Sequence, residues 1–218
     1  MSVVVDRLEN TAVSYKQLIE LIHHSFEERI QQGLFFTCST MTEEKYINKT
    51  KDGVVLVAMD NETNELLGTA TIHIRKDNRN IIYGYNEYLA ISPSAKRKGI
   101  GTKLLEKQMM IVINANGEYI ESDTAVGAKS SVCWHLKNGF KIVGLQSFIS
   151  TNYYSYVFRK QLVMSKKWNN EILVKLIYLF SAFRTKILKK ENGEYTVFGV
   201  ALKRISGWKK RLCRKYNG

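Results

Sequence analysis

The chain has 218 residues and a formal net charge of +13, and 44% of its residues are hydrophobic, 11% aromatic and 24% charged. This composition excludes a disordered, collagen-like or low-complexity chain, and the length allows one large domain, or a domain of about 150 residues with an appendage. The charge is unevenly distributed, since residues 165–218 hold 14 Lys and Arg against 3 Asp and Glu, whereas residues 1–164 hold 19 against 17.

The first fifty residues predict a strand and two helices. Residues 2–5 favour a short strand. Ser14 is a residue type that caps helices, and apolar residues recur after it every three or four positions, so we expect an amphipathic helix of about five turns that ends at Gly33. A link over residues 34–40, either a loop or a short helical segment, leads to a second, short helix that begins near Thr42.

Strands and helices follow in two different arrangements. Three strands joined by short polar turns predict an antiparallel meander, at residues 54–59, 66–75 and 81–91. Helices and strands then alternate, with helices at residues 102–114 and 129–137 and strands at residues 117–125, 140–146 and 153–159. We therefore expect an α/β (α+β) fold with a mixed, mainly antiparallel sheet of about six to seven strands flanked by helices.

A basic, glycine-containing loop lies between the third meander strand and the helix that follows it. Residues 96–101 read Lys-Arg-Lys-Gly-Ile-Gly. Glycines let the backbone approach a ligand, and the start of a helix presents free N–H groups and the positive end of its dipole, so this loop suits a phosphate or pyrophosphate. The spacing fits neither the dinucleotide fingerprint nor the nucleotide-triphosphatase loop. The alternative is a tight strand–helix connection with exposed lysines.

Residues 96–101 resemble the acyl-CoA loop of the GCN5-related N-acetyltransferase (GNAT) family. Residues 87–93 look like the fourth strand of that family and the start of its loop, and residues 134–140 are similar to its closing helix–turn–strand, which ends in Gly-Phe. The two motifs occur in the family's order, and the resemblance covers residues 2–162.

The resemblance implies transfer of an acetyl group from acetyl-CoA to an amine by direct attack in a ternary complex. It implies that acetyl-CoA lies along the backbone of one strand and that its pyrophosphate binds the loop. The corresponding residues are Leu89, Ala90 and Ile91 for the strand, and Lys96, Arg97, Lys98, Gly99, Ile100, Gly101 and Thr102 for the loop. The chain departs from the family pattern at three positions, where Lys96 replaces Gln or Arg, Ala128 an Asn, and His135 a Tyr.

Several side chains could move the protons of such a reaction. Glu87 is the first candidate for the base, and Glu121 and Asp123, two residues apart on one strand and so on one face, could bind the amine or act as the base instead. His135 occupies the position of the acid that protonates the leaving thiolate, and an imidazole suits proton exchange at neutral pH. The alternatives are solvated or ion-paired carboxylates and a surface histidine. No spacing typical of metal ligands is present.

The basic C-terminal part predicts an appendage, so we divide the chain into a GNAT-like domain at residues 1–164 and an appendage at residues 165–218. Within the latter, a helix at 168–190 and a strand at 196–202 are expected. The apolar stretch at 172–183 is too short to span a membrane. It could pack on the domain or on a second subunit of a homo-oligomer, or lie at a membrane surface with its lysines on anionic head groups; nucleic-acid binding is the weakest alternative.

The sequence thus predicts an acetyl-CoA-dependent N-acetyltransferase that acts on the amine of a small molecule or an amino sugar and needs no metal. Three widely spaced cysteines and no leader-like segment favour a cytoplasmic protein, with a peripheral location at the membrane as the alternative. The alternative is a non-catalytic acyl-CoA-binding or adaptor domain that its basic C-terminus recruits to membrane or nucleic acid.

Overall fold

The computed structural model describes residues 2–148, residues 151–162 and Thr196. The helix and strand expected at residues 168–190 and 196–202 lie outside these residues, apart from Thr196, and the proposed division at residue 164 stays a prediction. In the described residues, no helix combines the length and the apolar character that crossing a membrane requires.

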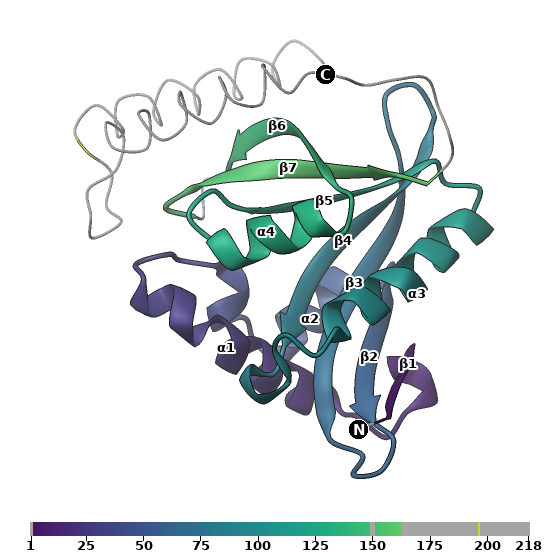
Figure 1. Ribbon diagram of the computed structural model, residues 1–218, viewed down its shortest axis with the longest axis vertical. Coiled ribbons are helices and arrows are strands. Elements are labelled where there is room, and N and C mark those ends of the chain that lie inside the picture. Colours follow the sequence, from purple (N-terminus) through teal and green to yellow (C-terminus); the bar gives the residue numbers. More distant parts are fainter. Residues whose placement is uncertain (1, 149–150, 163–195, 197–218) are drawn as a thin grey trace.

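The described residues form a seven-stranded sheet with helices on both faces (Figure 1). The strand order is β1-β2-β3-β4-β5-β7-β6, and all neighbouring strands are antiparallel except β4 and β5. In chain order the elements are β1 (Val3–Arg7), α1 (Tyr15–Gln31), α2 (Glu43–Thr50), β2 (Val54–Asp60), β3 (Leu66–Lys76), β4 (Ile82–Ile91), α3 (Ile100–Asn114), β5 (Tyr119–Ala125), α4 (Lys129–Lys137), β6 (Lys141–Ser147) and β7 (Tyr154–Gln161). The predicted mixed, mainly antiparallel sheet is confirmed.

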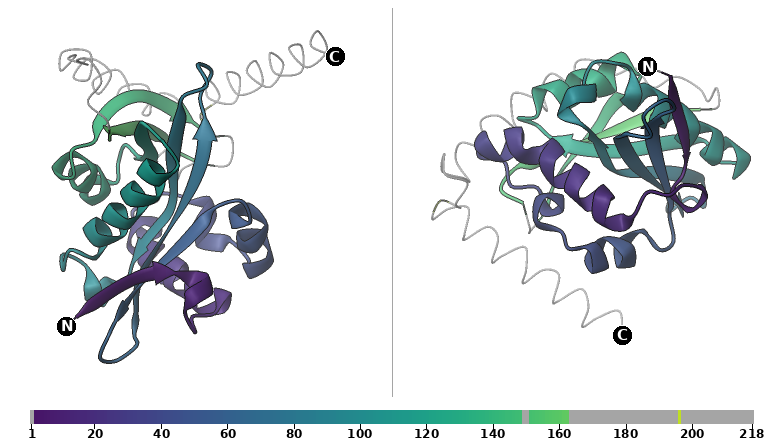
Figure 2. Two further views of the ribbon diagram at one scale, coloured as in Figure 1. Left: turned by 90° about the vertical axis from the view of Figure 1, so that its right-hand side faces the viewer. Right: turned by 90° about the horizontal axis from the view of Figure 1, so that it is seen from below.

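Alternation along β2 shows how the two faces of the sheet are covered. Val55 and Val57 are buried in the cluster that holds α1 and α2, whereas Leu56 and Ala58 are buried with the first turns of α3. A strand presents successive side chains to opposite faces, so a continuous apolar strand requires cover on both. Figure 2 shows α1 and α2 on one face and α3 and α4 on the other.

Local signals set the ends of α1 where the sequence predicted them. The Ser14 hydroxyl accepts from the Gln17 backbone amide at 3.3 Å, and the Gln17 side chain accepts from the Ser14 amide at 2.8 Å. This capping box is worth about 1 kcal/mol. Gly33 ends the helix in the left-handed conformation with φ +78°, which costs a glycine little. The link that follows contains a 3₁₀ turn at Thr37–Thr40.

Several boundaries differ from the predicted ones by one or two residues, and the start of α3 is the one that bears on the site. Helix α3 begins at Ile100, two residues before the expected start, and Gly99 is its N-cap with φ +79°. Gly101 therefore belongs to the first helical turn, where a Cβ atom would lie 3.2 Å from Nε1 of Trp134 in α4. The second glycine thus serves the close approach of two helices.

Strands β4 and β5 pair over only four residues and then separate. The parallel pairs run from Tyr83 with Tyr119 to Asn86 with Ser122. Beyond them β4 continues beside β3, while β5 turns away with β7 (Figure 1). Tyr88, with φ +54°, lies at an irregularity in the β3–β4 pairing, just past the point of separation. This opening in the sheet positions the candidate site.

Candidate active site

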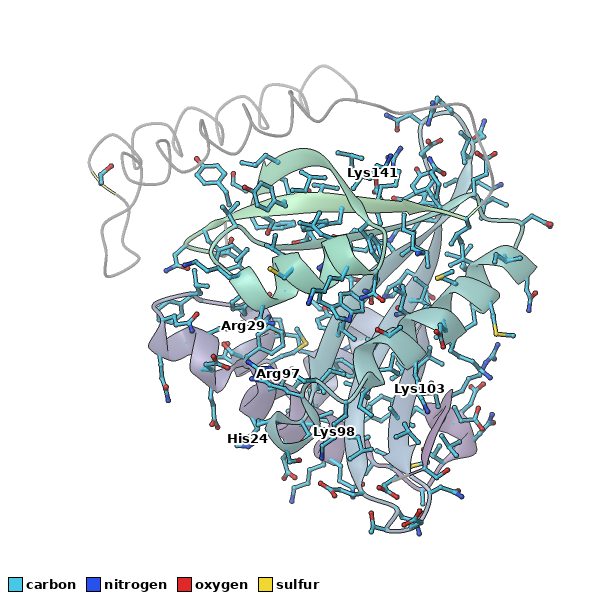
Figure 3. All side chains as sticks on the ribbon, viewed as in Figure 1. His24, Arg29, Arg97, Lys98, Lys103 and Lys141 are labelled. Atoms are coloured by element: carbon cyan, nitrogen blue, oxygen red, sulfur yellow. The ribbon has the colours of Figure 1, made fainter. Side chains whose placement is uncertain are left out.

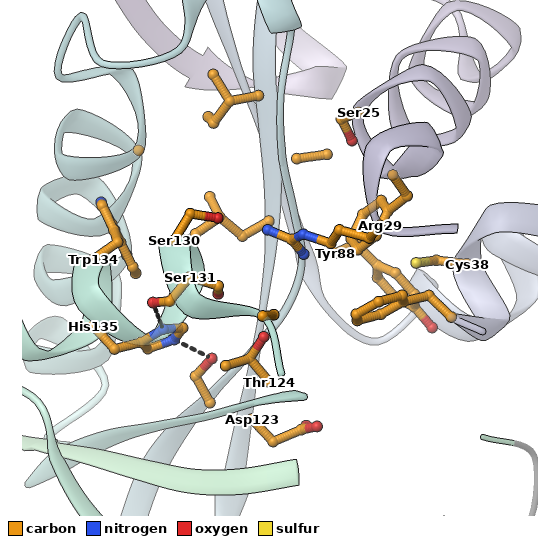
Figure 4. Close-up of a pocket in the computed structure, with 18 of the residues that line it drawn as sticks. Ser25, Arg29, Cys38, Tyr88, Asp123, Thr124, Ser130, Ser131, Trp134 and His135 are labelled. Carbon is orange, nitrogen blue, oxygen red and sulfur yellow. Dashed lines mark hydrogen bonds between the residues drawn. The ribbon is translucent and has the colours of Figure 1, made fainter. Parts of the chain in front are cut away.

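A cavity of about 1660 Å³ occupies the opening between β4 and β5. It is lined by residues of α1, by the end of β4, by the turn before α3 and by the first turns of α3 and α4 (Figure 4). Elements far apart in the sequence thus meet around a single space, and the chain has room there for both a large cosubstrate and an acceptor.

The strand edge that the resemblance assigns to the cosubstrate faces this cavity. Leu89, Ala90 and Ile91 all line it. Among the described strands β4 has β3 as its neighbour here and no partner on the other side, because the pairs with β5 stop at Asn86. Backbone N–H and C=O groups on that side are therefore available to an extended ligand that pairs with β4 as a further strand would.

The turn before α3 supplies a second set of backbone donors. Arg97 has φ +65° and Gly99 φ +79°, so the chain reverses twice within three residues before the helix begins. The amides of Arg97, Gly99, Ile100 and Gly101 donate to no other group of the described residues, whereas Lys98 donates to Ala95. Four free amides at a helix N-terminus form an anion site that suits a pyrophosphate.

The side chains of Lys96 and Lys98 are not placed together to bind a phosphate. Lys98 does not line the cavity. The Lys96 ammonium lies 2.8 Å from Oε2 of Glu28 in α1, and this hydrogen bond lowers the pKa of the Glu28 carboxyl. Lys96, at the family's Gln or Arg position, thus links the turn to α1, although it still lines the cavity. Arg97 lies at the turn itself (Figure 3).

Among the three predicted carboxylates, Glu87 and Asp123 line the cavity and Glu121 does not. Glu121 accepts from Nε of Arg159 at 3.0 Å, and the Arg159 guanidinium lies 4.0 Å from the ring centroid of Tyr119. This ion pair on the β5–β7 ladder removes Glu121 from the site, so its predicted role as an alternative base is not supported.

Glu87 and Asp123 lie in different surroundings. Glu87 Oε2 is 3.1 Å from Nε2 of His73 and 3.4 Å from Nη2 of Arg75. The Asp123 carboxylate accepts from the Tyr85 hydroxyl at 2.7 Å. Burial raises the pKa of Asp123, although the hydrogen bond from Tyr85 acts in the opposite direction. Asp123 is thus held by a neutral hydroxyl, whereas Glu87 lies against the Arg75 guanidinium and the His73 ring.

His135 is buried, with 2% of its surface exposed, and it is not the surface histidine that the sequence allowed. Its Nδ1 lies 2.8 Å from the Ser131 carbonyl and its Nε2 lies 2.9 Å from the Ser122 hydroxyl. A carbonyl can only accept, so Nδ1 carries the proton and Nε2 accepts from Ser122. Burial lowers the pKa of His135 to about 4, so the ring is neutral at pH 7 and cannot readily serve as the predicted acid.

Several residues of the cavity were not predicted from the sequence. Arg29 of α1 extends into it, and Tyr88 of β4 lines it (Figure 4). Tyr153, the residue before β7, lines it as well. Ser130 and Ser131 contribute the first turn of α4. Arg29 lies three residues after Phe26 on an amphipathic helix, a spacing that also suits an ordinary surface residue, so the sequence offered no signal for its role.

The chain has no cluster suited to a metal in its described part. No group of three or more His, Cys, Asp or Glu side chains is placed there to hold an ion. The chemistry that these residues can carry out is therefore binding of an anionic, extended ligand and proton transfer by a carboxylate.

Comparisons with known proteins find one family model that matches part of the chain. Residues 51–142 match the family described as "Acetyltransferase (GNAT) domain". No curated protein sequence matches the chain.

Solved structures share the fold at low sequence identity. The chain resembles a structure of the NatC complex bound to Gag peptide and CoA at 15% identity and TM-score 0.59, over 75% of this chain and 100% of that one. It resembles aminoglycoside 6'-acetyltransferase type Ii at 18% identity and TM-score 0.58, over 75% of this chain and 99% of that one. It resembles the structure of yncA from Salmonella typhimurium with its cofactor acetyl-CoA at 13% identity and TM-score 0.56, over 78% of this chain and 99% of that one. The resemblance found in the sequence is thus confirmed, because residues 51–142 match the GNAT acetyltransferase domain and the chain shares its fold with these solved structures.

Proposed function

We propose that this chain is an acetyl-CoA-dependent N-acetyltransferase that transfers an acetyl group to the amine of a small molecule within a ternary complex. The observation that carries the proposal is that one cavity joins the unpaired edge of β4 to the free amides of the turn before α3. A ligand with an extended amide arm at one end and a diphosphate at the other fits both features.

Each part of acetyl-CoA has a counterpart in the cavity. The amides of residues 97 and 99–101 bind the pyrophosphate, and the edge formed by Leu89, Ala90 and Ile91 pairs with the pantetheine arm. The thioester then lies where β4 and β5 separate, past Asn86 and Ser122. Solved structures of the same fold contain CoA or acetyl-CoA, which supports this placement.

Glu87 acts as the base in this proposal. The acceptor amine is an ammonium ion in water and must lose a proton before its nitrogen can attack the thioester carbonyl. Glu87 lines the cavity at the irregular part of β4 and accepts that proton, directly or through a water molecule. As the C–N bond forms and the C–S bond breaks, the nitrogen loses its second proton, and the coenzyme A thiolate takes up one proton through solvent. His135, neutral and hydrogen-bonded at both nitrogens, holds β5 and α4 together.

A thiol-release assay with a panel of amines tests the proposal. An enzyme releases free coenzyme A from acetyl-CoA only when a suitable amine is present, and acetylated amine forms in equal amount. An acyl-CoA-binding or adaptor domain would bind coenzyme A in calorimetry and release no thiol with any amine. The same calorimetry tests the site, because failure to bind coenzyme A would contradict the assignment of both the β4 edge and the turn.

A further inference from the structure

We propose that Arg29 binds an anionic group of the acceptor, so that the substrate is an amine that also carries a carboxylate or a phosphate. This inference rests on the proposed function and specifies its substrate class. The observation behind it is a guanidinium that extends from α1 toward the middle of the cavity (Figure 4) and forms no ion pair with a carboxylate of residues 2–148 or 151–162.

Aromatic rings hold the guanidinium in place. The Arg29 Cζ atom lies 4.9 Å from the ring centroid of Phe26 and 5.5 Å from that of Phe36. The two rings are 4.9 Å apart, and Phe36 in turn lies 4.8 Å from Tyr153. All three aromatic residues are buried in one core cluster, so the rings form a fixed support for the cation. A side chain positioned in this way loses little conformational entropy when it binds a ligand.

The carboxylates of the cavity are already engaged with other groups. Within the described residues, Glu28 pairs with Lys96, Glu87 lies against His73 and Arg75, and Asp123 accepts from Tyr85. No ion pair or hydrogen bond joins Arg29 to any carboxylate in this part of the chain.

The Glu28 carboxylate, which pairs with Lys96, acts on Arg29 only through space, and the other ionisable neighbours do not offset the charge of the guanidinium. Burial raises the pKa of the Cys38 thiol to about 12, and it also raises the pKa of the Tyr153 hydroxyl, so both groups are neutral at pH 7. The guanidinium keeps its proton at that pH, although burial lowers its pKa. A partly desolvated cation without a counter-ion is costly unless a ligand supplies the negative charge.

Hydrogen-bond donors lie across the cavity from Arg29. Ser130 and Ser131 form the first turn of α4, and Figure 4 shows them on the wall that the guanidinium faces. Their backbone amides and their hydroxyls donate to no other described residue. A carboxylate or phosphate between the two walls could accept from both sides, and a guanidinium binds either anion through two parallel hydrogen bonds.

This anion is assigned to the acceptor because the cosubstrate's pyrophosphate already has a site. The free amides of residues 97 and 99–101 belong to the turn before α3, whereas Arg29 is surrounded by α1, the segment before the 3₁₀ turn and the start of β7. The same charge disfavours polycationic amines such as aminoglycosides, which would bring further positive charge against Arg29.

Matched pairs of acceptors test the inference. We would compare kcat/KM for each of the standard amino acids with that for its amide, and for O-phosphoethanolamine with that for ethanolamine; each pair differs chiefly in the anion. The wild-type protein should prefer the anionic member of at least one pair by about 30- to 100-fold, as expected when a partly desolvated charge pair is lost. The amino acid and phosphate pairs show which of the two anions is used.

Three variants separate the role of Arg29 from a general effect of charge. Arg29→Gln should abolish the preference, and Arg29→Lys, which keeps the charge without the planar fork, should restore part of it. Arg79→Gln is the matched control, because Arg79 is an exposed arginine that pairs with Asp77 in the β3–β4 turn and should leave the preference unchanged. Calorimetry with coenzyme A checks that the Arg29→Gln protein is folded and binds the cosubstrate as the wild type does.

Each outcome decides between the two proposals. Acetylation of the amides as efficiently as of the amino acids, or a preference that survives Arg29→Gln, would refute the role of Arg29 while leaving the acetyltransferase intact. A loss of coenzyme A affinity in Arg29→Gln would assign the residue to the cosubstrate and refute it as well. If no amine is acetylated, the proposed function is wrong, and binding of N-acetyl amino acids against their amides to the coenzyme A-loaded protein then tests the anion site alone.

Discussion

The Ser122 hydroxyl donates a hydrogen bond of 2.9 Å to Nε2 of His135, and the other ring nitrogen donates to the Ser131 carbonyl at 2.8 Å. The ring stacks on Phe158 at a centroid distance of 4.4 Å. Because the ring is buried, the protonated form would lose its hydration, and the Ser122 hydroxyl would have to change from donor to acceptor. The hydrogen bond between Ser122 and His135 therefore holds α4 against β5, and protonation of His135 at acidic pH should destabilise the folded protein.

His135 should make the protein less stable as the pH falls from about 6.5 to about 4. The folded pKa is lowered to about 4, against an ordinary value of 6.5, so protons bind the unfolded chain preferentially in this window. The free energy of unfolding should lose on the order of 3 kcal/mol across the window from this residue and change no further below it. Urea unfolding at a series of pH values measures the loss.

The variant His135→Gln keeps a donor and an acceptor near Ser131 and Ser122 but cannot titrate. Its stability should depend less on pH between 6.5 and 4 than that of the wild type. His24→Gln is the control, since His24 is an exposed side chain of α1. An equal pH dependence in the wild type and His135→Gln would contradict the buried neutral imidazole.

Replacing Glu87 by Gln should lower kcat by about 10²- to 10⁴-fold, the range expected for removal of a general base, with little effect on coenzyme A affinity. The amide keeps the size of the side chain but cannot accept the proton of the ammonium. Steady-state kinetics and calorimetry on the same preparation measure the two effects. A variant that keeps wild-type kcat would show that another group or water removes the proton.

Tyr85→Phe distinguishes the two carboxylates of the cavity. The Tyr85 hydroxyl lowers the pKa of Asp123, so its removal should raise that pKa further. If Asp123 were the base, the acidic limb of the kcat/KM profile would move to higher pH in this variant. We expect the limb to stay in place, because Glu87 removes the proton, and Asp123→Asn should keep most of the activity.

Gly99→Ala should weaken coenzyme A binding about tenfold and destabilise the protein by about 1 to 2 kcal/mol. No atom lies within 4 Å of the position of a Cβ there, so the effect comes from the left-handed backbone at φ +79° and not from crowding. Calorimetry with coenzyme A and thermal unfolding measure both quantities. Gly144→Ala in β6, where the nearest atom lies at an ordinary 3.8 Å, should change neither.

Gly84→Ala should cost about 1 to 3 kcal/mol of unfolding free energy, because the new methyl group would overlap Cγ2 of Val112 in α3 and approach Cδ1 of Ile72 to 2.9 Å. Val112→Ala removes the atom that is overlapped. The double variant should therefore lose less than the sum of the two single variants, with a coupling above about 0.5 kcal/mol. Strictly additive losses would show that α3 moves away instead.

Much of the fold could be predicted because its signals are local. Residues 54–59 are buried on both faces and read as one apolar run, whereas α1 has its cap, its periodicity and its terminal glycine within 20 residues. The start of α3 was misplaced because a glycine at the first turn of a helix looks like a loop residue in sequence. The reason for a glycine at position 101 is a tertiary contact with Trp134, which lies 33 positions later in the chain.

The candidate site was also predicted only in part from the sequence. The loop at residues 96–102 was found from its glycines and cations, but the sequence could not show that Lys96 pairs with Glu28, that Lys98 lies off the cavity, or that Glu121 is held by Arg159. The two ion pairs join residues that are 68 and 38 positions apart in the sequence. The charge of a side chain limits which groups it can bind, but the tertiary structure determines which of those groups it contacts.

By itself, the sequence determined the order of the helices and strands and the turn that carries free amides, because caps, periodicity and glycine conformation act over a few neighbouring residues. The tertiary structure alone decided that β4 and β5 separate after Asn86, that His135 is buried and neutral, and that Arg29 enters the cavity without an ion pair to any carboxylate of the described residues. These features depend on burial and on distances between distant segments, and both exist only once the sheet has formed.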